Sequence, residues 1–154
     1  MKRRSFIQNT LALAAGLVAG GSGLLYLPRA QAARPDAAFV AKDLDTVLQE
    51  ILGGAQASQS DQIKLDAPLQ AENGAVVPVV VETTLPAPEQ IAIVVPKNPT
   101  PLLTVLETTP RTGNYVRMRI KMAGSDQVVA YVKSGGQWYT ASQEVRVAVG
   151  GCGG

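Results

Sequence analysis

The feature that most constrains the fold is a series of short runs rich in β-branched residues, each separated from the next by residues typical of turns. Runs of this length and composition are typical of strands, and the Asn-Gly, Gly-Gly and Asn-Pro pairs between them are typical of tight turns. The predicted strands cover residues 62–65, 76–84, 90–95, 102–108, 115–122, 128–133 and 144–149. Short strands at this spacing predict an all-β fold, an immunoglobulin-like antiparallel β-sandwich.

One short N-terminal helix is predicted ahead of the strands, over residues 38–52. Apolar residues recur there at three- and four-residue spacing, which is the period of one helical face. The pair Gly53-Gly54 ends this pattern.

Two of the predicted strands carry further information. Pro78 cannot donate a backbone hydrogen bond, so the strand over 76–84 is predicted at a sheet edge or at a bulge. Along 115–122 apolar and basic residues alternate, which gives that strand a core face and a basic face. The core face carries Val116, Met118, Ile120 and Met122, and the basic face carries Arg117, Arg119 and Lys121. A solvated sheet surface accounts for such a stripe, and a docking surface for an acidic or anionic partner is the alternative.

The chain ends in Gly-Gly-Cys-Gly-Gly, residues 150–154, directly after the alternating segment 144–149. The residues Gly150, Gly151, Gly153 and Gly154 favour neither helix nor strand and leave the thiol of Cys152 without neighbouring side chains. We therefore expect a flexible C-terminal arm that the last strand anchors to the sheet. The alternatives are a frayed terminus and a buried structural cysteine, although glycine offers no apolar surface with which to bury the segment.

Cys152 is the only cysteine, and the chain has no histidine. These residues cannot supply an intrachain disulfide, a closed zinc shell or an imidazole to activate the thiol. We therefore expect no metal, no cofactor and no catalytic residue. Three functions remain: a covalent carrier, an exported interaction domain that uses Cys152 for an interchain disulfide, and a thiol redox enzyme.

Residues 1–32 are predicted to be an export signal. The pair Arg3-Arg4, followed by Ser-Phe-Ile, resembles a twin-arginine signal, and an apolar stretch over 11–27 follows it. The small residues of Ala30-Gln31-Ala32 predict cleavage after about Ala32 and a periplasmic location. A stable membrane anchor is the alternative, which the short length and the glycines of the stretch disfavour.

Removal of this segment changes the charge of the protein. The segment holds four basic residues and no acidic one, so the 14 basic residues of the chain fall to 10 against 12 acidic residues, a net charge near −2. Bulk charge then gives no support for nucleic-acid binding. The rest of the chain predicts one domain over 33–149, the helix and the sandwich, followed by the arm at 150–154.

Five segments of the chain form a recognisable set: the pair Arg3-Arg4, residues 73–79, 97–101 and 117–120, and above all the terminal 150–154. This set resembles the SoxY family, the sulfur-carrier subunits of the bacterial thiosulfate-oxidising Sox system. The resemblance covers the whole chain, and the terminal motif is its most specific part.

The resemblance implies that Cys152 holds sulfur intermediates covalently, first as an S-thiosulfonate, and that the chain itself has no catalytic site. It implies a heterodimer with a SoxZ-like subunit. The other implied partners are a haem-bearing cytochrome that couples thiosulfate to the thiol, a hydrolase that releases sulfate and, where the organism has one, a sulfane dehydrogenase.

Overall fold

The computed structural model describes residues 35–148. In chain order its elements are the helices α2 (Asp36–Val40) and α3 (Leu44–Leu52) and the strands β1 (Ala57–Gln59), β2 (Ile63–Asp66), β3 (Gln70–Ala71), β4 (Val77–Thr83), β5 (Pro88–Val94), β6 (Leu102–Glu107), β7 (Tyr115–Ile120), β8 (Asp126–Ser134) and β9 (Gln137–Val147).

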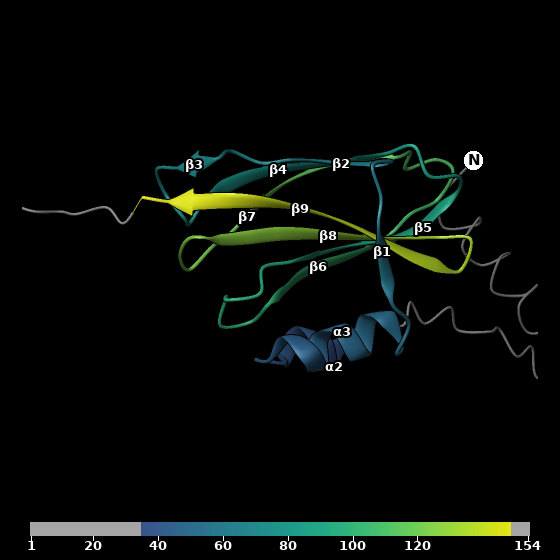
Figure 1. Cartoon of the computed structure of the whole chain (residues 1–154), viewed down its shortest axis with the longest axis horizontal. Helices are drawn as coiled ribbons and strands as arrows, with labels where there is room; N and C mark the ends of the chain where they lie inside the picture. Colours follow the sequence, from purple (N-terminus) through teal and green to yellow (C-terminus); the bar gives the residue numbers. More distant parts are fainter. Residues whose placement is uncertain (1–34, 149–154) are drawn as a thin grey trace, which may run out of the picture. The chain divides into compact units, whose positions relative to one another are not determined.

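The strands form two sheets that pack face to face (Figure 1). The larger sheet has the order β1-β9-β8-β5-β6, with β3 also paired to β9, and the smaller sheet has the order β2-β4-β7. The two helices lie against the outer face of the larger sheet (Figure 1). The all-β sandwich predicted from the sequence is confirmed.

The main core lies between the two sheets and follows from the two-residue period of the strands. In β4 the side chains of Val77, Val79 and Val81 are fully buried, while the residues between them face outward. The predicted alternation of β7 is confirmed, because Ile120 is buried and Met118 packs against the same core.

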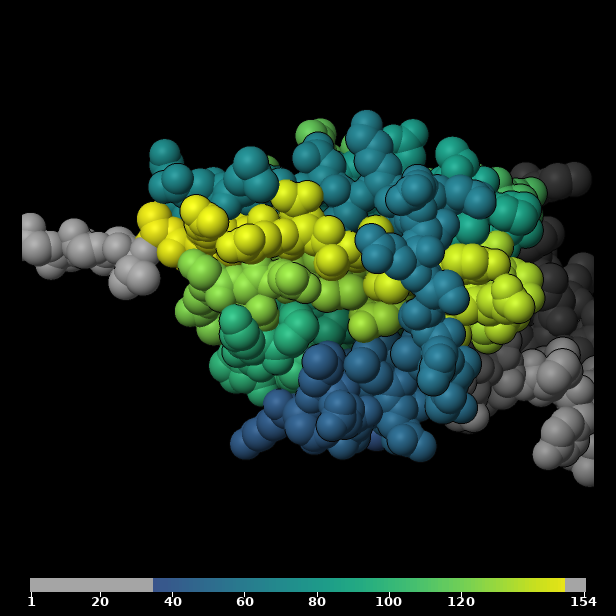
Figure 2. Space-filling model, viewed as in Figure 1, coloured from purple at the N-terminus to yellow at the C-terminus, as the bar shows by residue number. Residues whose placement is uncertain are grey.

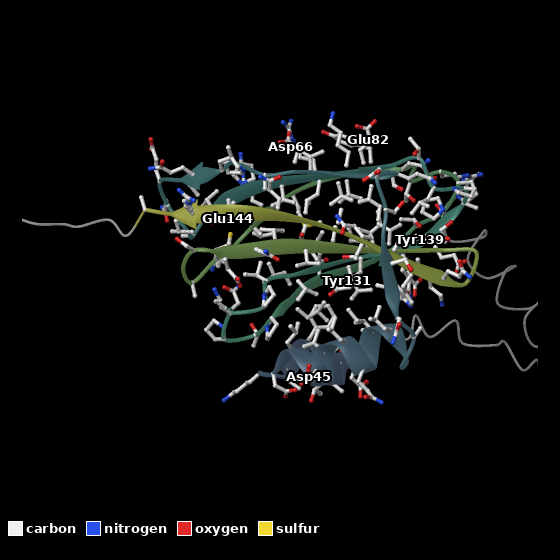
Figure 3. The ribbon with its side chains drawn as sticks, in the orientation of Figure 1. Asp45, Asp66, Glu82, Tyr131, Tyr139 and Glu144 are labelled. Carbon is white, nitrogen blue, oxygen red and sulfur yellow. The ribbon has the colours of Figure 1, made fainter. Side chains whose placement is uncertain are left out.

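A second core lies between the helices and the larger sheet. It explains why the run from Ile91 to Val95 in and after β5 is apolar without alternation, because both faces of β5 are covered. Ile91 and Ile93 face the smaller sheet, whereas Ala92 and Val94 face the helices. Tyr131 of β8 lies between the larger sheet and the helices (Figure 3), and its partial burial there raises the pKa of its phenol.

The predicted helix over 38–52 is wrong in one respect, because two helices occupy this region. Ala41 has an extended backbone, and α3 begins afresh after Asp43, whose Oδ1 accepts a hydrogen bond of 2.8 Å from the Thr46 backbone N–H. A short acidic side chain at this position competes with the helical backbone for hydrogen bonds and starts a new helix. Gly53 ends α3 in the left-handed region, as predicted.

The predicted antiparallel arrangement also needs correction. The short strands β1 and β3, which the sequence did not indicate, both pair in parallel with β9. The last strand is longer than predicted, since it starts at Gln137, directly after the tight turn at Gly135 and Gly136. Both glycines have positive φ angles, 57° and 74°, which suit a two-residue hairpin turn.

The strand that contains Pro78 is central and not at an edge, contrary to the sequence prediction. The ladder between β2 and β4 stops at the pair Asp66 and Val80, so at Pro78 the strand β4 pairs only with β7. Pro78 therefore lies beside an open stretch of an otherwise central strand.

The cap of α3 predicts a pH-dependent contribution to stability. The hydrogen bonds from Thr46 lower the pKa of Asp43 in the folded protein, so the stabilisation is present above the ordinary aspartate pKa and is lost as the pH falls through the lower, folded value. The melting temperature of Asp43→Ala should lie below that of the wild type at neutral pH, and the gap should narrow below about pH 3.9. Asp43→Asn is the control, because an amide oxygen still accepts the bond but does not titrate. If the melting temperatures of the wild type and Asp43→Ala differed by the same amount at neutral pH and below about pH 3.9, this assignment would be contradicted.

Candidate functional site

The residues that sequence analysis singled out for function lie outside the described part of the chain. These are Cys152 with Gly150, Gly151, Gly153 and Gly154, and the arginines Arg3 and Arg4. The structure describes the chain up to Ala148, four residues before Cys152. It therefore reports on the root of the terminal segment, the point at which β9 ends.

The root is held on one side by the segment that contains β3. The backbone N–H of Arg146 donates to the carbonyl oxygen of Leu69 at 2.9 Å, and the N–H of Ala148 donates to that of Ala71 at 2.8 Å. Ala71 is itself buried in the main core. The parallel pairing of β3 thus secures the last residues of β9 to the body of the sandwich.

On the other side Ser125, in the loop before β8, holds the same strand. The Val147 backbone N–H donates to Ser125 Oγ at 2.9 Å, and this hydroxyl donates to the Val147 carbonyl oxygen at 3.4 Å. Val145, two residues earlier, is fully buried. The end of β9 is therefore held from both sides by hydrogen bonds. In Figure 2 the strand, in yellow, lies between the teal surface of an earlier segment and the green surface of β8.

Gly74 lies against this root and leaves no room for a side chain. Its carbonyl oxygen accepts a hydrogen bond of 2.7 Å from the Met122 N–H. A Cβ atom at position 74 would clash with the carbonyl oxygen of Met122 and lie 3.0 Å from Cγ1 of Val147. The preceding Asn73 closes the turn, since its Oδ1 accepts from the Ala75 N–H at 2.8 Å.

The side chain of Asn98 joins a third loop to the same end of the sandwich. Its Nδ2 donates to the carbonyl oxygen of Lys121 at 2.8 Å, and its Oδ1 accepts from the N–H of Ala123 at 2.8 Å. Both bonds are made by a buried side chain, so they hold the loop after β7 firmly. Nearby, the buried carboxylate of Asp126 accepts a hydrogen bond of 2.6 Å from the Lys97 backbone N–H and lies 3.7 Å from the Lys97 ammonium.

These contacts bring together the internal segments that carried the family resemblance. The segments 73–79 and 117–120 adjoin in the ladder between β4 and β7, and Gly74 and Asn98 both bind the residues that directly follow β7, near the end of β9. Sequence analysis did not identify the roles of Ser125, Asp126 or the carbonyl groups of Leu69 and Ala71. A backbone carbonyl has no sequence signature, so the sequence pattern could not indicate these contacts.

The described residues contain neither a cluster of metal ligands nor a helix able to span a membrane. Within 35–148 no three His, Cys, Asp or Glu side chains come together as a metal ion would require. Neither α2 nor α3 is long and apolar enough to span a membrane.

The fold and this root define a class of protein, a β-sandwich module whose last strand is fixed on both sides and ends five residues before a single thiol. The family model described as sulfur oxidation protein SoxY matches residues 48–152, a range that includes Cys152. The chain belongs to the SoxY family.

Comparison with solved structures supports this assignment. The sulfur carrier protein SoxY from Chlorobium limicola f thiosulfatophilum is 37% identical and superimposes with a TM-score of 0.63, over 71% of this chain and 96% of that chain. The superoxide reductase (neelaredoxin) from Ignicoccus hospitalis shows a slight likeness, with 17% identity and a TM-score of 0.48, over 68% of this chain and 92% of that chain. A search of curated proteins found no match.

The contact at Gly74 predicts that Gly74→Ala destabilises the protein. The added Cβ must displace the Met122 carbonyl group or Val147, and overpacking of this kind costs about 1–3 kcal/mol of unfolding free energy. Gly124→Ala is the matched control, because nothing lies within 4 Å of a Cβ at that position. Denaturant unfolding of both variants measures the difference. Equal unfolding free energies would show that the root tolerates a side chain at position 74.

Proposed function

We propose that the protein is a sulfur carrier of thiosulfate oxidation and that Cys152 holds the sulfur intermediates covalently. The observation that carries this proposal is the fixed end of β9, five residues before the only thiol of the chain, inside a region that matches the SoxY family. The likeness to the sulfur carrier protein SoxY from Chlorobium limicola f thiosulfatophilum supports it.

In the proposed cycle the thiol of Cys152 loses its proton and forms a disulfide bond to the outer sulfur of thiosulfate. The two electrons released pass to a haem-bearing partner, and the product is a cysteine S-thiosulfonate. A hydrolase then adds water to the sulfonate sulfur, so sulfate leaves and one sulfur atom stays on the cysteine as a persulfide. A sulfane dehydrogenase, where present, oxidises this remaining sulfur. In this cycle the chain supplies the thiol that holds the sulfur intermediates, and its partners catalyse the reactions.

The geometry of the root suits a carrier because the end of β9 is fixed and only a short segment leads from it to Cys152. Cys152 is the fourth residue after Ala148, and this stretch spans at most about 14 Å when extended. Two glycines on each side of the cysteine add no side chain that would prevent entry into a narrow active site. The partner enzymes can then take up the same thiol in turn, while a SoxZ-like subunit forms the proposed heterodimer with the sandwich.

An exported interaction domain that uses Cys152 for a permanent interchain disulfide is the second candidate. It is favoured by the unpaired thiol alone, since an oxidising compartment promotes such bonds. It predicts a covalent dimer that thiosulfate cannot modify.

Substitution of the thiol tests both candidates. Cys152→Ser should abolish thiosulfate-dependent sulfur oxidation and change the unfolding free energy by less than about 0.5 kcal/mol, which is typical of surface positions. Intact mass spectrometry of the wild-type protein from cells given thiosulfate should show a thiosulfonate or sulfane adduct that the variant lacks. Gly154→Ala is the control, because it alters the terminus and keeps the thiol. A wild-type protein found only as a thiosulfate-insensitive disulfide dimer would support the second candidate instead.

The proposed location is the periplasm, reached by the twin-arginine route with cleavage after about Ala32. The double substitution Arg3→Lys and Arg4→Lys keeps the charge but removes the paired guanidinium groups, so the protein should stay in the cytoplasm uncleaved, and any subunit exported with it should stay there too. Cell fractionation with mass measurement of the N-terminus checks this. Lys2→Arg is the control, and normal export of the double variant would contradict the proposed route.

A further inference from the structure

Each sheet has a terminal strand at either side, and on one side of the sandwich these terminal strands are β6 and β7. The strand β6 ends the larger sheet and pairs only with β5, and β7 ends the smaller sheet and pairs only with β4. An unpaired edge presents backbone N–H and C=O groups that can bind a further strand.

Between these two edges lies a groove of about 600 Å³. Its lining comes from both strands: Leu103, Thr104 and Leu106 of β6, and the residues from Val116 to Lys121 in and after β7. The side chains of Leu103, Val116 and Met118 are only partly buried there, although they pack against the main core. The groove therefore exposes part of the apolar interior along the free edge of β7.

The rim of this groove is basic and lacks acidic partners. The side chains of Arg117, Arg119 and Lys121 are exposed on the outer face of β7 and line the groove. None of them belongs to the ion pairs found within 35–148.

Within the described residues the neighbouring strand β4 forms no ion pair with this rim. Across β4 the residues opposite Arg117 and Arg119 are Val80 and Pro78. The same sheet has two acidic residues (Figure 3). Asp66 lies on β2, and Glu82 lies on β4 opposite Tyr115. The basic rim is thus free to attract an acidic group from outside the described chain.

We propose that this groove binds an extended segment of a partner protein in which acidic residues alternate with apolar ones. A strand added to the free edge of β7 would place every second side chain about 5 Å from the row of Val116, Met118 and Ile120. The side chains between them would lie beside the row of Arg117, Arg119 and Lys121. Apolar residues suit the first row, and Asp or Glu suits the second. This surface acts independently of the chemistry at Cys152.

A second copy of this chain fits the same edge poorly. Edge-to-edge pairing of two β7 strands would bring the basic rows of both copies together, and like charges on neighbouring strands destabilise a sheet. The basic residues therefore protect the edge from self-association while they leave it open to an acidic strand. An anionic membrane surface would contact the basic rim but would leave the apolar groove beside it empty. It therefore accounts for only part of this surface.

The test measures binding of a fluorescent peptide of alternating Glu and Val to the purified protein with its thiol alkylated, followed by anisotropy. Reversal of two rim charges, Arg117→Glu with Arg119→Glu, should weaken binding about tenfold, because two attractive contacts become repulsive. Lys64→Glu is the matched control. Lys64 is exposed on β2, two strands and about 10 Å away, so its reversal should change affinity by less than about twofold.

Two further peptides separate strand pairing from simple charge attraction. A peptide with the same side chains but N-methylated alternate amides should bind poorly, because it cannot form the backbone ladder, and a Lys and Val peptide should not bind. Equal binding of all three peptides, or equal loss with Lys64→Glu, would overturn the proposal. So would vesicles of phosphatidylserine that bind through the rim while the Glu and Val peptide does not. Sedimentation showing that the protein alone forms a dimer through this edge would also overturn it.

Discussion

The structure depends on the pairing of β9 along both of its edges. On one edge β9 pairs with β8 over the whole of β8, and on the other it pairs with β1 near its start and β3 at its end. Because side chains alternate along a strand, a shift of one residue would turn Val145 out of the core. The register of this one strand therefore decides both how the core is filled and where the chain leaves the sandwich.

The loops at that end act as a single support for the last residues of β9. Gly74 allows one loop to approach Met122 and Val147, and Asn98 binds the backbone on both sides of Met122. Each position needs its residue type for a local reason, since one has no space for a Cβ and the other satisfies two buried backbone groups with one side chain. These contacts together fix the last described residues of β9, from which the chain continues into the terminal segment.

The two sides of the sandwich differ in whether their strand edges are paired. The chain itself covers one edge of β9, where β1 and β3 add to the sheet in parallel. On the other side β6 and β7 each keep one edge unpaired within the described residues. The basic row of β7 borders a groove with a partly apolar lining. One region of the sandwich therefore holds the last residues of β9, and a separate region keeps two free strand edges.

The sequence by itself determined the sandwich, the alternation of β7 and the turn at Gly135-Gly136, because these depend on local periodicity and backbone freedom. It also predicts a role for Cys152 from the count of one residue type, and that residue lies outside 35–148. It also indicated the segments 73–79 and 97–101 without saying what they do. Only the tertiary structure decided that Asp43 splits the helical region, that Pro78 belongs to a central strand, and that β1 and β3 pair in parallel with β9. The anchoring by Ser125 and the carbonyl groups of Leu69 and Ala71 was decided there too. The physical reason is that a backbone hydrogen bond between distant segments depends on where the packed core places them, and the residues that form it need no particular side chain.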